Sequence, residues 1–311
     1  MAQIVVSEFM DEAAVARLRC GHDVLYDATL VERPDDLAAA VRTARALIVR
    51  NRTEVRVPLL CAAPRLAVVG RLGVGLDNID LDACRERAIE VHPATGANAA
   101  AVAEWATAAM LHLVRGAFAA TGRMLAGEWP RADLVGGELG GRRLGLVGFG
   151  AIARKVARIA GALGMRVGAY DPFLPAEAAA WAEADRYGEL ELLLADADVL
   201  SLHLPLSEAN RHLIDAAALA RLPAGAIVLN SARGGLIDEA ALADALRAGR
   251  LGGAALDVFE TEPIDNRTAR LFDGIPNILL TPHIAGVTRE SNVRVSALVA
   301  SRVLDSLARL G

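Results

Sequence analysis

Short apolar runs alternate with amphipathic segments along most of the chain. The first five runs are rich in β-branched residues and predict strands, and helical periodicity fills the intervals, as at residues 34–43. These strands are predicted at Ile4 to Ser7, Asp23 to Asp27, Ala46 to Arg50, Leu66 to Gly70 and Ile89 to Pro93. The alternation predicts a parallel sheet covered by helices.

A second series of the same kind begins near residue 144. Its strands are predicted at Leu144 to Gly148, Arg166 to Asp171, Asp198 to Pro205, Ala226 to Arg233, Gly253 to Phe259 and Asn277 to Ile284. The alanine-rich segment from Asn98 to Leu125 predicts a long helix that connects the two series. A final helix is predicted at about Arg289 to Leu310, long enough to return to the first domain.

The order of these elements predicts an α/β protein with two parallel-sheet domains, Rossmann-like or flavodoxin-like, one inserted in the other. The outer domain takes residues 1–98 and 288–311, and the inserted domain takes residues 99–287. A chain of 311 residues is long enough for two buried cores.

Composition narrows the class of protein further. Apolar residues make up 54% of the chain, but no apolar run is long enough to span a bilayer, and the first residues lack the pattern of a secretory signal. The three cysteines are far apart and are not spaced as metal ligands, so we expect free thiols, no metal and a cytoplasmic protein. The net charge of −5 and the dispersed basic residues do not favour nucleic acid or membrane partners.

A glycine turn with the pattern G-x-G-x-x-A opens the second series. Gly148 allows a tight turn and Gly150 lets the main chain approach a pyrophosphate, while the helix that opens at Ala151 directs N–H groups at the phosphates. Asp171 follows about 20 positions later, where a carboxylate binds a ribose and favours NAD over NADP. The alternative is a packing turn that binds nothing.

Three further motifs follow later predicted strands, where ligands collect in open parallel sheets. They are NSARGGLIDEAAL from Asn230, ALDVFETEP from Ala255 and TPHIAG from Thr281. They contain Arg233, Glu262 and His283. Each residue alone has a structural alternative: a surface arginine, a loop acid and a packed histidine.

These motifs, together with GRLGVGLDNID from Gly70, NAAAVAE from Asn98, the glycine turn and SLHLPL from Ser201, follow the order seen in one enzyme family. Over nearly its whole length the sequence resembles the NAD-dependent D-2-hydroxyacid dehydrogenases, especially the phosphoglycerate dehydrogenase branch. The segment from Val6 to Ala14 is also similar to sulfolactate dehydrogenases of this family. The resemblance implies NAD as cofactor, a small 2-hydroxy or 2-keto acid as substrate, a homodimer, and substrate binding where the two domains meet.

The resemblance also assigns roles. Arg233 grips the substrate carboxylate and carbonyl, His283 is the general acid/base and Glu262 pairs with His283. This chemistry is sound because a hydride transfer at C2 needs a proton partner for the oxygen, and histidine titrates near neutrality. Further cofactor contacts are implied at Ala151, Ile152, His203, Pro205, Ser231, Ala232, Asp257 and Gly286.

At the substrate end, the GVG turn resembles the family loop whose N–H groups hold the substrate carboxylate, which implicates Val74 and Gly75. Arg50 and Arg52 resemble the position at which the phosphoglycerate branch binds a distal phosphate, although loop arginines are most often solvated. The expected substrate is therefore of the 3-phosphoglycerate or 3-sulfolactate type.

Two alternatives stay open at this point. The first is a hydroxypyruvate or glyoxylate reductase, whose substrate has no second anion. The second is an NAD(H)-sensing regulator similar to the corepressors of the family, because a fold does not determine a function.

Overall fold

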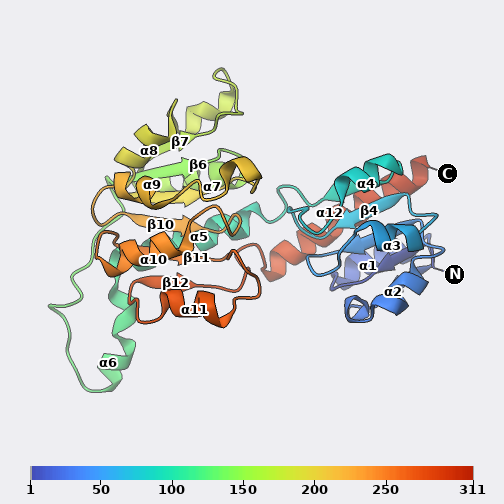
Figure 1. Ribbon diagram of the computed structural model, residues 1–311, viewed down its shortest axis with the longest axis horizontal. Helices are drawn as coiled ribbons and strands as arrows, with labels where there is room; N and C mark the ends of the chain where they lie inside the picture. Colours follow the sequence, from blue (N-terminus) through green and yellow to red (C-terminus); the bar gives the residue numbers. More distant parts are fainter. Residues whose placement is uncertain (1, 311) are drawn as a thin grey trace. The chain divides into compact units, whose positions relative to one another are not determined.

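The computed structural model describes residues 2–310, which divide into two compact units. The first unit comprises residues 1–98 and 287–311, and the second comprises residues 99–286. Each unit has its own parallel sheet (Figure 1). The predicted class, with two parallel-sheet α/β domains, is confirmed.

The first unit is built on a five-stranded sheet with the order β2-β1-β3-β4-β5. Its strands are β1 (Ile4–Val6), β2 (Val24–Tyr26), β3 (Ala46–Val49), β4 (Val68–Arg71) and β5 (Glu90–Pro93). Its helices are α1 (Glu12–Arg19), η1 (Leu30–Glu32), α2 (Pro34–Ala40), α3 (Val57–Ala62), α4 (Leu81–Glu86) and α12 (Arg289–Arg309).

Alternation along the strands gives this sheet two apolar faces. In β1, Ile4 and Val6 belong to the core shared with α1 and α12, while Val5 belongs to the opposite core with α2, α3 and α4. Successive side chains of a strand point to opposite faces, so the unbroken run Ile-Val-Val supplies both cores.

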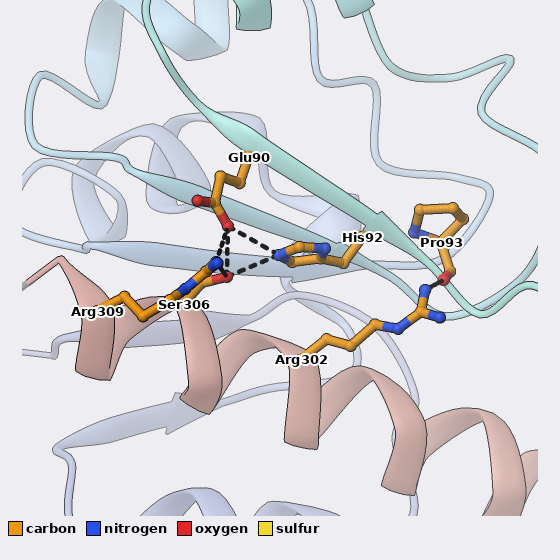
Figure 2. A network of polar contacts seen from close by, with 6 residues as sticks. All are labelled: Glu90, His92, Pro93, Arg302, Ser306 and Arg309. Atoms are coloured by element: carbon orange, nitrogen blue, oxygen red, sulfur yellow. Dashed lines mark hydrogen bonds and ion pairs between the residues drawn. The ribbon is translucent and has the colours of Figure 1, made fainter.

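Polar contacts fasten α12 to β5 at the edge of the sheet (Figure 2). Ser306 Oγ lies 2.5 Å from Glu90 Oε2 and 2.7 Å from His92 Nε2, and Arg309 donates to Glu90 at 2.7 Å. The hydrogen bond from Ser306 and the charge of Arg309 hold the pKa of Glu90 below its usual value. Glu90 and Ser306 both contact Nε2 of His92. A serine nucleophile activated through a histidine would need its carboxylate on the other ring nitrogen, so these contacts have a structural role.

The second unit contains a seven-stranded sheet with the order β12-β11-β10-β9-β6-β7-β8. Its strands are β6 (Arg143–Val147), β7 (Arg166–Tyr170), β8 (Asp185–Arg186), β9 (Val199–Leu202), β10 (Ile227–Asn230), β11 (Gly253–Leu256) and β12 (Ile278–Leu280). Its helices are α5 (Ala99–Arg115), η2 (Ala117–Ala120), α6 (Thr121–Leu125), α7 (Ala151–Ala162), η3 (Ala179–Glu183), α8 (Leu190–Asp196), η4 (Glu208–Asn210), α9 (Ala216–Arg221), α10 (Glu239–Arg247) and α11 (Asn266–Phe272).

Helices α5 and α7 cover one face of this sheet, and α8, α9, α10 and α11 cover the other. The chain starts at β6, runs outward through β7 and β8, and then returns to build β9 to β12 on the other side of β6. The order therefore reverses between β6 and β9. In open α/β sheets this reversal opens a crevice at the carboxyl ends of the strands.

The connecting helix is shorter than its composition suggested. The prediction of one helix from Asn98 to Leu125 was wrong beyond Arg115, because Gly116 adopts a left-handed conformation with φ of 66° and ends α5. The short helices η2 and α6 follow, and in Figure 1 the α6 segment extends away from the rest of its unit.

Candidate active site

The glycine turn lies at the reversal of strand order. Gly148 follows β6 with φ of +83°, and a Cβ there would lie 2.6 Å from the carbonyl oxygen of His203. Only glycine fits this left-handed, crowded position. Gly150 is the N-cap of α7, and a Cβ added to it meets no heavy atom within 4 Å. Open space thus faces the N-terminus of a 12-residue helix, the arrangement that binds a pyrophosphate.

Asp171, directly after β7, lies beside this turn. Its carboxylate oxygens accept hydrogen bonds from the N–H of Phe149 at 2.9 Å and of Phe173 at 3.0 Å. The acid is therefore held at the open side of the glycine turn, where its negative charge disfavours a 2′-phosphate. Together the turn, the helix terminus and the acid fit an NAD molecule.

The other predicted cofactor residues also lie on the second unit, near the carboxyl ends of its strands. Ala151 and Ile152 open α7, His203 and Pro205 follow β9, Ser231 and Ala232 follow β10, Asp257 follows β11, and Gly286 ends the unit. His203 Nε2 lies 3.0 Å from Ser201 Oγ, and burial lowers the pKa of His203 to about 4. His203 is therefore neutral at pH 7, which suits a contact residue better than a proton donor.

Glu262 and His283 form a direct pair in the second unit. Glu262 Oε2 lies 2.6 Å from His283 Nδ1, and Glu262 Oε1 accepts the N–H of Phe259 at 3.0 Å. Burial acts to raise the pKa of Glu262, but these hydrogen bonds and the positive charges of His283 and Arg233 hold that pKa below its usual value. An ionised carboxylate on Nδ1 fixes the tautomer of the ring and directs Nε2 outward. His283 is 45% exposed, so its ring is accessible.

The turn that carries His283 is held by Asp257, which is 1% exposed. Asp257 Oδ1 accepts the hydroxyl of Thr281 at 2.5 Å and the N–H of Ile284 at 2.8 Å, and Oδ2 accepts the N–H of Ala285 at 2.8 Å. His283 itself has φ of +54° and donates its N–H to the carbonyl of Asp257. Such a conformation is uncommon for a non-glycine residue and persists where neighbours impose it. The expected contact of Asp257 with the cofactor stays a prediction.

Arg233 lies on the loop after β10, which Asn230 shapes. The Asn230 side chain is 2% exposed, donates to the carbonyl of Arg233 at 2.8 Å and accepts the N–H of Ala232 at 3.0 Å. Gly234, which follows Arg233, lies so close to Phe259 that a Cβ on Gly234 would be 1.8 Å from the carbonyl oxygen of Phe259. The loop of Arg233 therefore lies against the segment that precedes Glu262, and the charge of Arg233 acts on the carboxylate that contacts His283. The supporting role of Asn230 was not predicted, although it stands in the quoted NSARGG motif.

Apart from Arg233, the predicted substrate residues lie on the first unit. Val74 and Gly75 are half-buried in the loop between β4 and α4, and Arg50 and Arg52 lie after β3. The two arginines differ in their surroundings. Arg52 is 57% exposed and forms an ion pair with Glu32 at 3.1 Å, whereas the half-buried Arg50 donates from Nη2 to the neutral side chain of Asn292 at 2.9 Å.

Within residues 2–310, no group of three or more histidine, cysteine or acidic side chains is arranged to hold a metal ion. Over the same residues, no helix combines the length and the apolar character that a membrane crossing requires.

A sequence profile of the D-isomer specific 2-hydroxyacid dehydrogenase NAD-binding domain matches residues 107–285. The chain belongs to the D-isomer specific 2-hydroxyacid dehydrogenases. The family inferred from the motifs is thus confirmed, and this dehydrogenase is an NAD-dependent enzyme rather than a regulator without turnover.

Named relatives cover almost the whole chain. A (S)-sulfolactate dehydrogenase of Chromohalobacter salexigens is 53% identical over 307 residues, which are 99% of each chain. A hydroxypyruvate reductase of Thermotoga maritima is 36% identical over 308 residues, 98% of each chain. The NAD-bound 3-phosphoglycerate dehydrogenase of Entamoeba histolytica is similar in structure, with a TM-score of 0.82, 27% identity and coverage of 100% of this chain and 96% of that one.

Proposed function

We propose that this dehydrogenase interconverts a D-2-hydroxy acid that carries a second anionic group and its 2-keto acid, with 3-sulfolactate and 3-phosphoglycerate as the two types. The observation that carries the reaction is the 2.6 Å contact of Glu262 with His283, on which the charge of Arg233 also acts. The Arg50 environment supports the second anionic group.

Three side chains carry the chemistry in this proposal. A bound NAD would supply the acceptor, or in reverse the donor, of the hydride at C2. His283 Nε2 takes the proton of the C2 hydroxyl during oxidation and returns it to the carbonyl oxygen during reduction. Glu262 keeps Nδ1 protonated and stabilises the imidazolium. Arg233 binds the substrate carboxylate through its planar fork, and its charge polarises the ketone.

The remaining predicted residues bind the two ligands. The helix-opening turn with Gly148, Gly150, Ala151 and Ile152 holds the pyrophosphate, and Asp171 holds the adenosine ribose. His203, Pro205, Ser231, Ala232, Asp257 and Gly286 line the cofactor. On the first unit, Val74 and Gly75 supply N–H groups to the substrate carboxylate.

Arg50, rather than Arg52, binds the distal anion. The Arg52 charge is already paired with Glu32 at an exposed position, where such pairs contribute little and the side chain stays mobile. Arg50 is half-buried, and its guanidinium is oriented by a neutral amide, while the nearby Glu8 carboxylate accepts the backbone N–H of Arg50. The hydrogen-bond partner of the guanidinium therefore does not cancel its charge. A guanidinium suits a sulfonate or a phosphate because its parallel N–H groups match two anionic oxygens.

The stereochemistry agrees with a sulfolactate substrate. In sulfolactate the carbon that bears sulfur outranks the carboxyl carbon, so the S descriptor denotes the spatial arrangement that is D in lactate. The (S)-sulfolactate named for the Chromohalobacter relative is therefore the isomer expected of a D-specific family.

A panel of keto acids tests this function. NADH oxidation is measured with 3-sulfopyruvate, 3-phosphohydroxypyruvate, hydroxypyruvate and glyoxylate. We expect kcat/KM to be at least about tenfold higher for 3-sulfopyruvate or 3-phosphohydroxypyruvate, the two acids with a second anionic group. This is the effect of about 1.4 kcal/mol from one added ionic contact. A preference for hydroxypyruvate or glyoxylate would favour the reductase activity named for the Thermotoga relative and would remove the role of Arg50.

The enzyme acts as a cytoplasmic homodimer in this proposal. Apolar side chains are strongly exposed on the segment after α5: Phe118, Leu125, Trp129 and Val135 are 71–85% exposed. Exposed apolar residues in such a concentration mark an interaction surface, and a second copy of the chain would cover it. Trp129→Glu should convert the dimer into a monomer in sedimentation equilibrium.

The free thiols support the cytoplasmic part of this proposal. Cys20, Cys61 and Cys84 form no disulfide, which suits a reducing compartment.

A further inference from the structure

Three segments of the first unit meet at the Arg50 guanidinium. Arg50 follows β3, Phe9 lies in the loop between β1 and α1, and Asn292 lies in the first turn of α12. Arg50 Nη2 donates to Asn292 Oδ1 at 2.9 Å, and Arg50 Cζ lies 5.7 Å from the centre of the Phe9 ring. The hydrogen bond sets the direction of the guanidinium, and the ring attracts its charge.

The backbone of the 50–53 loop is held by two buried side chains, Glu8 and Asn78. Glu8 is 4% exposed, and its carboxylate accepts the N–H groups of Arg50 at 2.8 Å, Thr53 at 3.0 Å and Arg52 at 3.2 Å. Asn78 is 5% exposed and donates to the carbonyls of Arg50 at 2.9 Å and Thr53 at 2.7 Å. A loop with its donors and acceptors satisfied by buried side chains is rigid, which suits a site that must hold a side chain in one position.

The chemistry of Asn292 matters as much as its position. An aspartate at this place would orient Arg50 equally well, but it would cancel the charge that attracts an anion. Asparagine accepts the hydrogen bond and carries no charge, so it orients Arg50 without neutralising it. Burial lowers the pKa of Arg50, while the nearby Glu8 acts to raise it, and arginine stays protonated at neutral pH.

We infer that Asn292 is a specificity-determining residue of this dehydrogenase. It acts as a positioning residue that holds Arg50 toward the sulfonate or phosphate of the substrate, with Phe9 supporting the other side of the guanidinium. This inference rests on the proposed role of Arg50. It extends the substrate site to the C-terminal helix, which lies outside the sequence motifs.

The test compares two substrates in matched variants. Wild type, Asn292→Ala, Asn292→Asp, Arg50→Ala and the control Val293→Ala are assayed with NADH and either 3-sulfopyruvate or glyoxylate. Val293 is the next residue on α12, is 50% exposed and has no part in the proposed site. Thermal unfolding of each variant identifies any that fails to fold.

Asn292→Ala should raise KM for 3-sulfopyruvate about tenfold, the effect of losing one hydrogen bond to a charged group, with kcat nearly unchanged. KM for glyoxylate should stay within about twofold of wild type, because glyoxylate has no distal anion. Asn292→Asp should raise KM for 3-sulfopyruvate further, since the new carboxylate pairs with Arg50 and repels the sulfonate. A purely structural role would change both substrates together.

The outcomes separate the two claims. If Arg50→Ala abolishes the preference for 3-sulfopyruvate but both Asn292 variants retain it, the positioning role is wrong and the proposed function stands. If Arg50→Ala retains the preference, the distal-anion role of Arg50 is wrong and the role of Asn292 falls with it. Equal losses for both acids in Asn292→Ala also overturn the inference.

Discussion

The Glu262 carboxylate reaches Nδ1 of His283 at 2.6 Å, and the same carboxylate is anchored by the N–H of Phe259. Glu262→Gln preserves the shape of this contact but removes its charge. We expect kcat to fall about a hundredfold in Glu262→Gln and by up to about 10⁴ in His283→Ala, the range for losing a general acid/base. NADH binding, followed by fluorescence titration, should stay within about twofold of wild type. Near wild-type turnover in His283→Ala would remove the assigned mechanism.

The pH dependence of this pair has a definite sign. The pKa of Glu262 is lowered in the folded protein, so this carboxylate stays ionised below the ordinary carboxyl pKa, and its charge beside Nδ1 is lost as the pH falls through the lowered value. The pH profile of kcat for wild type should therefore fall on the acid side where Glu262 is protonated. The profile of Glu262→Gln should lack this fall.

In the proposed function, Asp171 sets the choice between NAD and NADP. Its carboxylate is fixed by the N–H groups of Phe149 and Phe173 beside the glycine turn. Asp171→Ala removes both the ribose acceptor and the repulsion of a 2′-phosphate. The ratio of kcat/KM for NADH to that for NADPH should therefore fall at least about tenfold, a change of about 1.4 kcal/mol. A wild-type enzyme that already prefers NADPH would contradict this role.

The sequence predicted both sheets because β-branched runs alternated with helical periodicity. It failed where local pattern carries no information. Strand β8 consists of the exposed Asp185 and Arg186, and it is a strand only because it pairs with β7 at the edge of the sheet. The end of α5 was overlooked although Gly116 marked it, since alanine continues on both sides of that glycine.

The residues that carry the proposed chemistry were predictable because each has a distinctive side chain after a predicted strand. Their supports were not. Glu8 and Asn292 are far from Arg50 in sequence, and neither side chain reveals which loop it holds. Asn230 lies next to predicted residues, but its hydrogen bonds to Ala232 and Arg233 depend on the path of the loop. A sequence motif therefore reveals the reacting group more easily than it reveals the groups that orient that reacting group.

His203 should make the stability of the protein depend on pH. Burial lowers its pKa from 6.5 to about 4, so between these values the unfolded chain binds a proton that the folded protein does not. Stability then falls as the pH falls from 6.5 toward 4, by about 2 kcal/mol between pH 7 and pH 5. Urea unfolding at pH 7 and pH 5 should show that the free energy of unfolding of wild type falls by this amount more than that of His203→Gln. Equal pH dependence in the two proteins would place a charged His203 in the folded state.

Glu8 should stabilise the first unit through the loop that bears Arg50. Glu8→Ala leaves three backbone N–H groups without their buried acceptor, and each such loss costs about 1–3 kcal/mol. Glu8→Gln retains one oxygen and should cost less, about 1–2 kcal/mol, because its amide nitrogen cannot accept the N–H of Arg52. Glu86→Gln, at an exposed position of α4, is the matched control and should change the free energy of unfolding by less than about 0.5 kcal/mol.

The order of the two Glu8 variants distinguishes hydrogen bonding from packing. If the carboxylate acts as an acceptor for the loop, the free energy of unfolding measured with denaturant is lowest for Glu8→Ala, higher for Glu8→Gln and highest for wild type. If Glu8 only fills space, Glu8→Gln has wild-type stability, because the two side chains have nearly the same volume. Wild-type stability in Glu8→Ala would mean that the 50–53 loop is not held by this carboxylate, and Arg50 would then lose the rigid support that its proposed binding role requires.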